Sequence, residues 1–178
     1  MANQGLTHFD DQGRSRMVDV GEKPITARQA RAAAEILLQP ATLELIRNRQ
    51  MSKGDVLEVA RLAGIMAAKR TSDLIPLCHP LSLDMVEIHF SFPAENCLRI
   101  ESTARVQART GVEMESLTAV SVAALTVYDM CKSVDRGRVI ARVQLVEKTG
   151  GKSGLFQNTL DAPDSPNVPK AERGIIEK

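Results

Sequence analysis

The spacing of apolar residues changes near residue 85, and this change constrains the fold more than any other feature of the sequence. Over residues 86–92 and 98–106, apolar and polar side chains alternate, which is typical of strands with one buried face. The short segment between these runs contains Pro93 and Asn96, so the two strands are expected to form a hairpin. Before and after this region, apolar residues recur three and four positions apart, as they do in helices. The pattern therefore predicts an α+β fold in which helices pack on an antiparallel sheet.

Residues 26–49 are predicted to form a helix in two pieces. Thr26 is a suitable N-cap, and the alanines and leucines that follow, up to residue 38, share one stripe at helical spacing. Pro40 has no backbone N–H to donate and therefore interrupts the helix, which residues 41–49 continue.

The remaining elements follow from the same signals. A helix that begins after Gly54 should end before Pro76, because a residue that precedes proline is pushed out of the helical region. A long helix with many small residues is expected over residues 113–134. A last strand, with alternating apolar residues, is expected over residues 139–147.

Length and composition limit the classes of function. The 178 residues suffice for a single domain, placed at residues 1–157, and the charged, proline-containing residues 158–178 are expected to be a flexible tail. A net charge of +1 and only 3% aromatic residues disfavour nucleic-acid binding. The three cysteines are widely spaced and no apolar run is long enough to cross a bilayer, so we expect a cytoplasmic protein without a membrane partner.

Two charged residues near the end of the long predicted helix are candidates for catalysis. Asp129 and Lys132 are three positions apart and therefore lie on one face, with Cβ atoms about 5–6 Å apart. A surface ion pair, contributing about 0–1 kcal/mol, explains this spacing as well. The neighbouring residues Tyr128, Met130 and Cys131 are mostly apolar, which indicates limited solvent. In such surroundings an Asp–Lys pair can exchange protons with a substrate, so both interpretations stay open.

The same helix begins with Glu113, Met114 and Glu115. Two acids in the first turn complement the helix dipole, which alone can explain them. Glu115 and Asp129 are fourteen residues apart, roughly 21 Å along a straight helix. One chain can hardly bring both ends of this helix to one small ligand, so a site that uses both ends needs a second subunit.

Further candidates lie in loops and at the ends of elements. The segment Leu77-Cys78-His79 lies between two prolines that restrict its backbone. An adjacent Cys–His pair does not match the spacing of zinc ligands, so no metal site is expected. Lys53 at a helix start and Lys148 at a strand end are placed where an anion could bind. The glycine-rich segment 150–154 lacks the first glycine of a phosphate-binding loop and is interpreted as a flexible loop.

Long, ordered motifs run from about Leu6 to Phe156. They are Leu6-Thr7-His8, Met17-Val18-Asp19-Val20, Lys53-Gly54-Asp55-Val56, Ala60-Arg61-Leu62-Ala63-Gly64-Ile65, Ala67-Ala68-Lys69-Arg70-Thr71, Asp73-Leu74-Ile75-Pro76-Leu77-Cys78-His79-Pro80, Thr110-Gly111-Val112-Glu113-Met114-Glu115, Tyr128-Asp129-Met130-Cys131-Lys132 and Gly150-Gly151-Lys152-Ser153-Gly154. In these motifs the chain resembles the cyclic pyranopterin monophosphate synthase family, also called the molybdenum cofactor biosynthesis protein C family. We find no departure at the positions that are functional in that family.

The resemblance implies a ferredoxin-like fold and a homohexamer, a trimer of dimers with sites between subunits. It implies a lyase of molybdenum cofactor biosynthesis that converts (8S)-3',8-cyclo-7,8-dihydroguanosine 5'-triphosphate into cyclic pyranopterin monophosphate and pyrophosphate. It implies no required cofactor and leaves open whether Mg²⁺ accompanies the triphosphate. By this resemblance Asp129 is the catalytic acid/base and Lys132 acts beside it. The implied substrate contacts are Leu77, Cys78, His79, Met114, Glu115, Lys53, Glu113 and Lys148.

Two other functions are compatible with the residues themselves. A non-catalytic nucleotide-binding module would use the lysines and the glycine loop for binding alone, without release of pyrophosphate. A structural assembly protein would use the small-residue helix as an interface, and substitutions at Asp129 and Lys132 would then have no effect.

Overall fold

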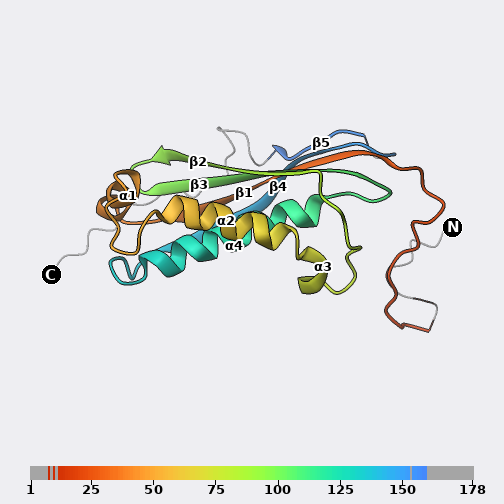
Figure 1. The fold of residues 1–178 in the computed structure, drawn as a ribbon, viewed down its shortest axis with the longest axis horizontal. Coiled ribbons are helices and arrows are strands. Elements are labelled where there is room, and N and C mark those ends of the chain that lie inside the picture. The colour runs from red at the N-terminus through yellow and green to blue at the C-terminus, as the bar shows by residue number, and fades with distance from the viewer. Residues whose placement is uncertain (1–7, 9, 11, 153, 160–178) are drawn as a thin grey trace.

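The helices of the chain lie on one face of a five-stranded antiparallel sheet (Figure 1). This computed structural model describes residues 8, 10, 12–152 and 154–159. In chain order the elements are β1 (Thr26–Leu37), α1 (Pro40–Arg47), α2 (Val56–Ala68), α3 (Thr71–Leu74), β2 (Met85–Ala94), β3 (Cys97–Ala108), α4 (Glu113–Cys131), β4 (Val139–Thr149) and β5 (Phe156–Gln157). The strand order is β2-β3-β1-β4-β5, and β1 lies between β3 and β4 as in ferredoxin-like folds. The predicted fold class is therefore confirmed.

The predicted hairpin is confirmed as β2 and β3, which pair antiparallel. Ile88 on β2 and Leu98 and Ile100 on β3 are buried in the core with residues of α2 and α4. The side chains of His89 and Glu101, at alternate positions, are exposed or half-buried. The alternation in the sequence thus predicts correctly which side chains of the two strands face the core.

Residues 26–37 form the central strand β1, so the helix predicted over residues 26–38 is wrong. β1 pairs with β3 along one side and with β4 along the other. Its residues Ala30, Ala32 and Ala34 are at most 1% exposed and occupy alternate positions. A run this rich in alanine fits both a helical stripe and an alternating pattern. Backbone pairing on both sides of the chain outweighs the helical preference of alanine here.

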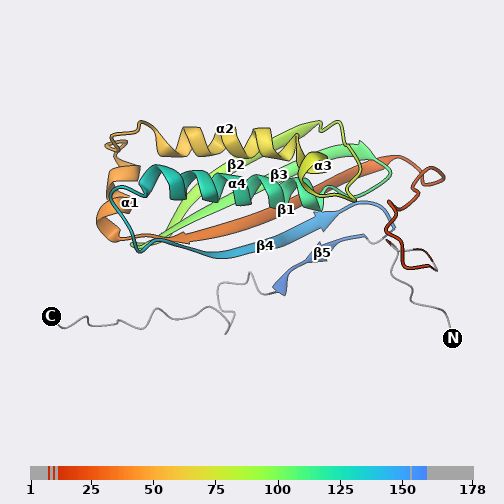
Figure 2. The same cartoon turned by 90° about the horizontal axis from the view of Figure 1, so that it is seen from below.

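Helices α2 and α4 lie side by side across the sheet (Figures 1 and 2). The carboxylate of Asp55 caps α2 by accepting hydrogen bonds from the backbone N–H groups of Leu57 and Glu58, at 3.1 and 3.2 Å. The helix predicted to run towards Pro76 ends earlier, at Ala68, and the short α3 follows it. The long helix ends at Cys131, three residues before the predicted residue 134.

The last predicted strand is confirmed as β4. The alternation of apolar residues along it, however, does not predict which of its side chains are buried. Val139 and Val143 are 51% and 43% exposed, whereas Val146 is 8% exposed and Ile140 packs against the core. The pairing of β4 with β1 contains two register shifts. Each bulge inserts a residue and changes which positions share a face.

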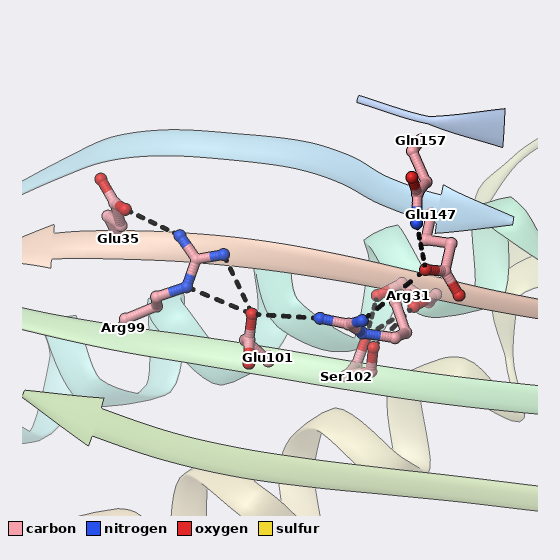
Figure 3. A network of polar contacts seen from close by, with 8 residues as sticks. Arg31, Glu35, Arg99, Glu101, Ser102, Glu147 and Gln157 are labelled. Carbon is pink, nitrogen blue, oxygen red and sulfur yellow. Dashed lines mark hydrogen bonds and ion pairs between the residues drawn. The ribbon is translucent and has the colours of Figure 1, made fainter. Parts of the chain in front are cut away.

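Alternating charges link the strands on the face of the sheet away from the helices (Figure 3). Arg99 contacts Glu35 and Glu101, each at 2.9 Å, and Arg31 contacts Glu101 at 3.7 Å and Glu147 at 3.9 Å. These pairs join β1, β3 and β4. The expectation of a sheet with one polar face is confirmed on these strands.

The end of the described chain pairs with β4 through β5, a strand that was not predicted. Asn158 continues this contact through its backbone N–H, which donates to the carbonyl of Val146 at 2.8 Å. Residues 160–178 of the predicted tail lie outside the described residues, so flexibility of the tail stays a prediction. Within the described part of the chain, no helix has the length and apolar character to cross a membrane.

Gly64 is required where α2 crosses α4. A Cβ atom at this position would lie 2.8 Å from the carbonyl oxygen of Ala119 on α4 and would also overlap the side chain of Ile88. The contact therefore places one helix backbone directly against the other.

Replacement of Gly64 by alanine is expected to destabilise the fold by about 1–3 kcal/mol, because the backbone of α4 must move away. Helix propensity acts in the opposite direction by up to about 1 kcal/mol, since alanine is the better helix former. Urea denaturation of the parent and the variant measures the difference in the free energy of unfolding. A variant at least as stable as the parent would contradict the close packing at this crossing.

Candidate active site

The predicted site residues form two clusters at opposite ends of α4, a helix of 19 residues that is roughly 28 Å long. The acid–lysine cluster at its C-terminal end consists of Asp129, Lys132 and Lys53, which lies in the loop between α1 and α2 (Figure 1). The cavity cluster at its N-terminal end consists of Leu77, Cys78, His79, Glu113, Met114, Glu115 and Lys148.

The acid–lysine cluster is built around the carboxylate of Asp129. The Nζ atom of Lys132, one turn further along α4, donates to Oδ1 at 2.6 Å. The Nζ atom of Lys53 is 3.8 Å from Oδ2 and donates to the backbone carbonyl of Asp129 at 3.2 Å. Lys53 thus joins the predicted pair from a distant part of the sequence.

The carboxylate of Asp129 is held in its ionised form. The hydrogen bond from Lys132 and the charges of Lys132, Lys53 and Arg138 hold its pKa below the usual range. Its side chain is 61% exposed in the single protomer, so the expectation of limited solvent at this position is wrong for one chain alone. An ionised, accessible carboxylate between two ammonium groups can accept a proton from a bound molecule.

A pocket of about 250 Å³ is lined by all residues of the cavity cluster except Lys148. The segment Leu77-Cys78-His79 lines it from the loop after α3, where the backbone N–H of Cys78 donates to the carbonyl of Ile75 at 3.1 Å. Glu113, Met114 and Glu115 line it from the first turn of α4. The structure therefore brings together the two segments that were predicted to contact substrate.

Glu115 is buried, with 4% of its surface exposed, although it carries a carboxyl group. Burial, together with the nearby charge of Glu113, raises its pKa above the ordinary value of 4.5. Burial and the charge of Glu115 also raise the pKa of the Cys78 thiol. Burial thus favours the protonated forms of the Glu115 carboxyl group and the Cys78 thiol.

A second cavity, of about 460 Å³, adjoins this pocket and is strongly basic. Both are lined by Glu113, whose carboxylate accepts from the Nζ atom of Lys148 at 2.8 Å. The other charged residues that line the larger cavity were missed by the sequence reasoning, and they are Lys23, Arg28, Arg109 and Lys152.

Arg28 shows how the fold shapes this cavity. Its Nη1 atom donates to the carbonyl of Gly150 at 3.4 Å, and its Nε atom is buried without a hydrogen-bond partner among the described residues. Gly151 has a φ of +69°, and a Cβ atom there would overlap the guanidinium of Arg28. Glycine suits this position because it adopts the positive φ readily and lets the guanidinium of Arg28 lie against the backbone. A buried donor without a partner is costly unless a ligand or water accepts from it.

Comparison with known proteins shows the family. The profile of the MoaC family matches residues 17–151, most of the chain. The chain belongs to the MoaC family. A cyclic pyranopterin monophosphate synthase of Herpetosiphon aurantiacus is 60% identical over 161 residues, which cover 90% of this chain and 98% of that protein. Enzymes of the same name from Heliobacterium modesticaldum and Parvibaculum lavamentivorans are 59% and 56% identical, over 85% and 88% of this chain and 96% and 99% of those proteins.

The matched range of the MoaC family contains both clusters and most of the basic cavity. Lys152 lies directly after it. Among the residues that the structure describes, no three His, Cys, Asp or Glu side chains are grouped so that they could hold a metal ion.

Replacement of Glu115 by glutamine is expected to stabilise the protein at neutral pH by about 0.5–2 kcal/mol, because a buried charge is removed. The folded-state pKa of Glu115 lies above its unfolded value, so ionisation costs stability as the pH rises through the folded pKa. The difference in Tm between variant and parent should be largest at pH 8 and should vanish below the ordinary pKa of 4.5. Equal melting temperatures throughout a pH series would contradict a buried, strained carboxyl group.

Proposed function

We propose that this chain is a cyclic pyranopterin monophosphate synthase of molybdenum cofactor biosynthesis. The observation that carries the proposal is the 60% identity to an enzyme of that name over 98% of that enzyme's length. The substrate is the 3',8-cyclised dihydroguanosine triphosphate, and the products are cyclic pyranopterin monophosphate and pyrophosphate.

The basic cavity supports a triphosphate substrate. Five cationic side chains and a single carboxylate, that of Glu113, are its charged groups among the described residues. Closing a cyclic phosphate expels pyrophosphate, and negative charge then develops on the leaving oxygens. Fixed cations stabilise this charge in the transition state. The buried Nε atom of Arg28 is a donor that a phosphate oxygen would satisfy.

The acid–lysine cluster supports the proton transfers. Opening the five-membered ring of the purine and closing the pterin and pyran rings requires several protons to move, and positioned side chains contribute to such steps. In this proposal Asp129 accepts and returns protons, and Lys132 and Lys53 donate to the substrate or balance its charge. These cations act without a redox cofactor, and an assay with a chelator decides whether Mg²⁺ must accompany the triphosphate.

The separation of the two clusters supports a site between subunits. Both belong to one rigid helix, so they cannot meet around one small molecule within a protomer. In the proposed homohexamer, a trimer of dimers, one protomer supplies the acid–lysine cluster and its neighbour supplies the cavity cluster. The three cysteine thiols are free, which fits the reducing cytoplasm that we propose as its compartment.

Pyrophosphate release from the cyclised nucleotide tests the proposed activity directly. Asp129→Asn is expected to lower kcat at least ~100-fold, because the amide cannot accept the proton, while assembly is unchanged. Glu44→Gln on α1 is the matched control, since Glu44 is exposed and outside both clusters. No pyrophosphate from the parent protein would end the proposal in favour of a nucleotide-binding module. Normal turnover by Asp129→Asn would remove this residue from the mechanism.

Co-expression of two inactive variants tests whether each site is shared. Asp129→Asn removes the acid–lysine function and Lys148→Met removes a cation of the basic cavity, so each variant alone should be nearly inactive. In mixed oligomers about a quarter of the sites would combine the two intact halves, and activity should return to that level. If mixed oligomers form and stay as inactive as either variant, both clusters must serve separate sites.

A further inference from the structure

Arg138 is a charged residue that the fold holds almost entirely away from solvent, with 8% of its surface exposed, directly before β4. Its Nε atom donates to the backbone carbonyl of Tyr128 at 2.8 Å, and its Nη1 atom donates to the carbonyl of Asp135. The guanidinium carbon lies 3.6 Å from the centroid of the Tyr128 ring. Burying a guanidinium is costly unless hydrogen bonds compensate, and here the compensation comes from backbone carbonyls and an aromatic face.

These contacts fix the last turn of α4, which carries Asp129 and is followed directly by the C-cap residue Lys132. The final carbonyl groups of a helix have no partner within it. Arg138 donates to the carbonyl of Tyr128, and Lys53 donates to that of Asp129, which also accepts from the backbone N–H of Lys132 at 3.4 Å. Positive charge at a helix C-terminus is also favourable for the helix dipole. Two cations from elsewhere in the chain therefore hold the turn that would otherwise fray most easily.

The other side of Arg138 is attached to a fixed loop. Asp135 is completely buried, and its carboxylate accepts from the backbone N–H of Gln39 at 2.7 Å and of Gly137 at 3.0 Å. Gln39 is the N-cap residue of α1. Arg138 thus connects the end of α4 to a loop that is itself anchored at the start of α1.

We propose that Arg138 is a positioning residue for the reaction, because it holds the last turn of α4 so that Asp129 and Lys132 stay beside Lys53. This inference rests on the proposed function of Asp129 and Lys132. Arg138 acts through the helix backbone, since its Nε and Nη1 atoms are directed to carbonyl groups of the chain. Its charge is a smaller influence on Asp129 than that of Lys132 or Lys53.

Two substitutions of Arg138 separate the effect of its hydrogen bonds from the effect of its charge. Arg138→Met keeps much of the length of the side chain but removes the donors and the charge. Arg138→Lys keeps the charge but loses the planar fork that reaches two carbonyl groups. Arg136→Met is the matched control, because Arg136 lies in the same loop with an exposed side chain. Circular dichroism and the elution volume show whether each variant folds and assembles like the parent.

Steady-state kinetics on folded protein are expected to show a kcat at least ~10-fold lower for Arg138→Met, with KM changed less than about threefold, because misplaced groups slow the reaction more than they weaken binding. Arg138→Lys should recover part of this loss, and Arg136→Met should stay within about twofold of the parent. A raised KM with unchanged kcat, or a loss confined to thermal stability, would overturn the positioning role. If Arg138→Met does not fold, Arg138→Lys must show the reduced kcat by itself.

Hydrogen exchange distinguishes failure of this inference from failure of the proposed function. The backbone N–H groups of residues 132, 134 and 135 donate to the carbonyls of Asp129 and Cys131 in the last turn of α4. In Arg138→Met these amides are expected to exchange at least ~10-fold faster than in the parent, while those of the first half of α4 are unchanged. Unchanged exchange at these amides would refute the fixing of the turn, whether or not the parent releases pyrophosphate. Faster exchange in Arg138→Met, combined with a parent protein that releases no pyrophosphate from the cyclised nucleotide, would refute the proposed function and, with it, the catalytic purpose of Arg138.

Discussion

The close packing of α4 against small residues is the constraint on which the rest of the structure depends. Alanine side chains of β1 lie beneath the helix, and Gly64 of α2 lies beside it. Small residues allow backbones to approach closely, and close-packed interfaces resist displacement. The helix is therefore a rigid rod whose two ends are placed accurately within the domain. Both clusters of candidate site residues belong to those ends, so the same contacts that stabilise the core also set the position of the chemistry.

The two ends of this rod have opposite electrostatic requirements. Acidic residues are favourable in the first turn, where Glu113 and Glu115 lie, whereas an acid such as Asp129 is unfavourable in the last turn. Lys53, Lys132 and Arg138 offset this cost by placing positive charge around the final carbonyls and the carboxylate. An aspartate is ionised at neutral pH even at its ordinary pKa, so the main effect of these cations is to lower the electrostatic cost of an acid at a helix C-terminus.

Local patterns were sufficient for some elements and insufficient for others, for identifiable reasons. The hairpin and α4 were predicted because strict alternation and a long small-residue helix each have one interpretation. β1 was missed because alanine carries no preference for one face, and only pairing with β3 and β4 decides its conformation. The site motifs identified Asp129 and Lys132, and the fold then placed Lys53 beside them. Arg28 and its neighbours in the basic cavity were missed because their convergence is set by strand register and by the glycine turn at residue 150.

In a single protomer, each end of α4 lacks a different part of what the proposed reaction needs. At one end the carboxylate of Asp129 is more than half exposed, although catalytic proton transfer is most effective where water is excluded. At the other end lie the buried Glu115 and the Nε atom of Arg28, which has no hydrogen-bond partner in the described part of the chain, and both are beside cavities that have room for a ligand. One end thus has an ionised acid that a single chain leaves largely exposed, while the other end has cavities lined by several cations. The two halves complement each other only if they come from different copies of the chain, which makes assembly a condition of the proposed chemistry.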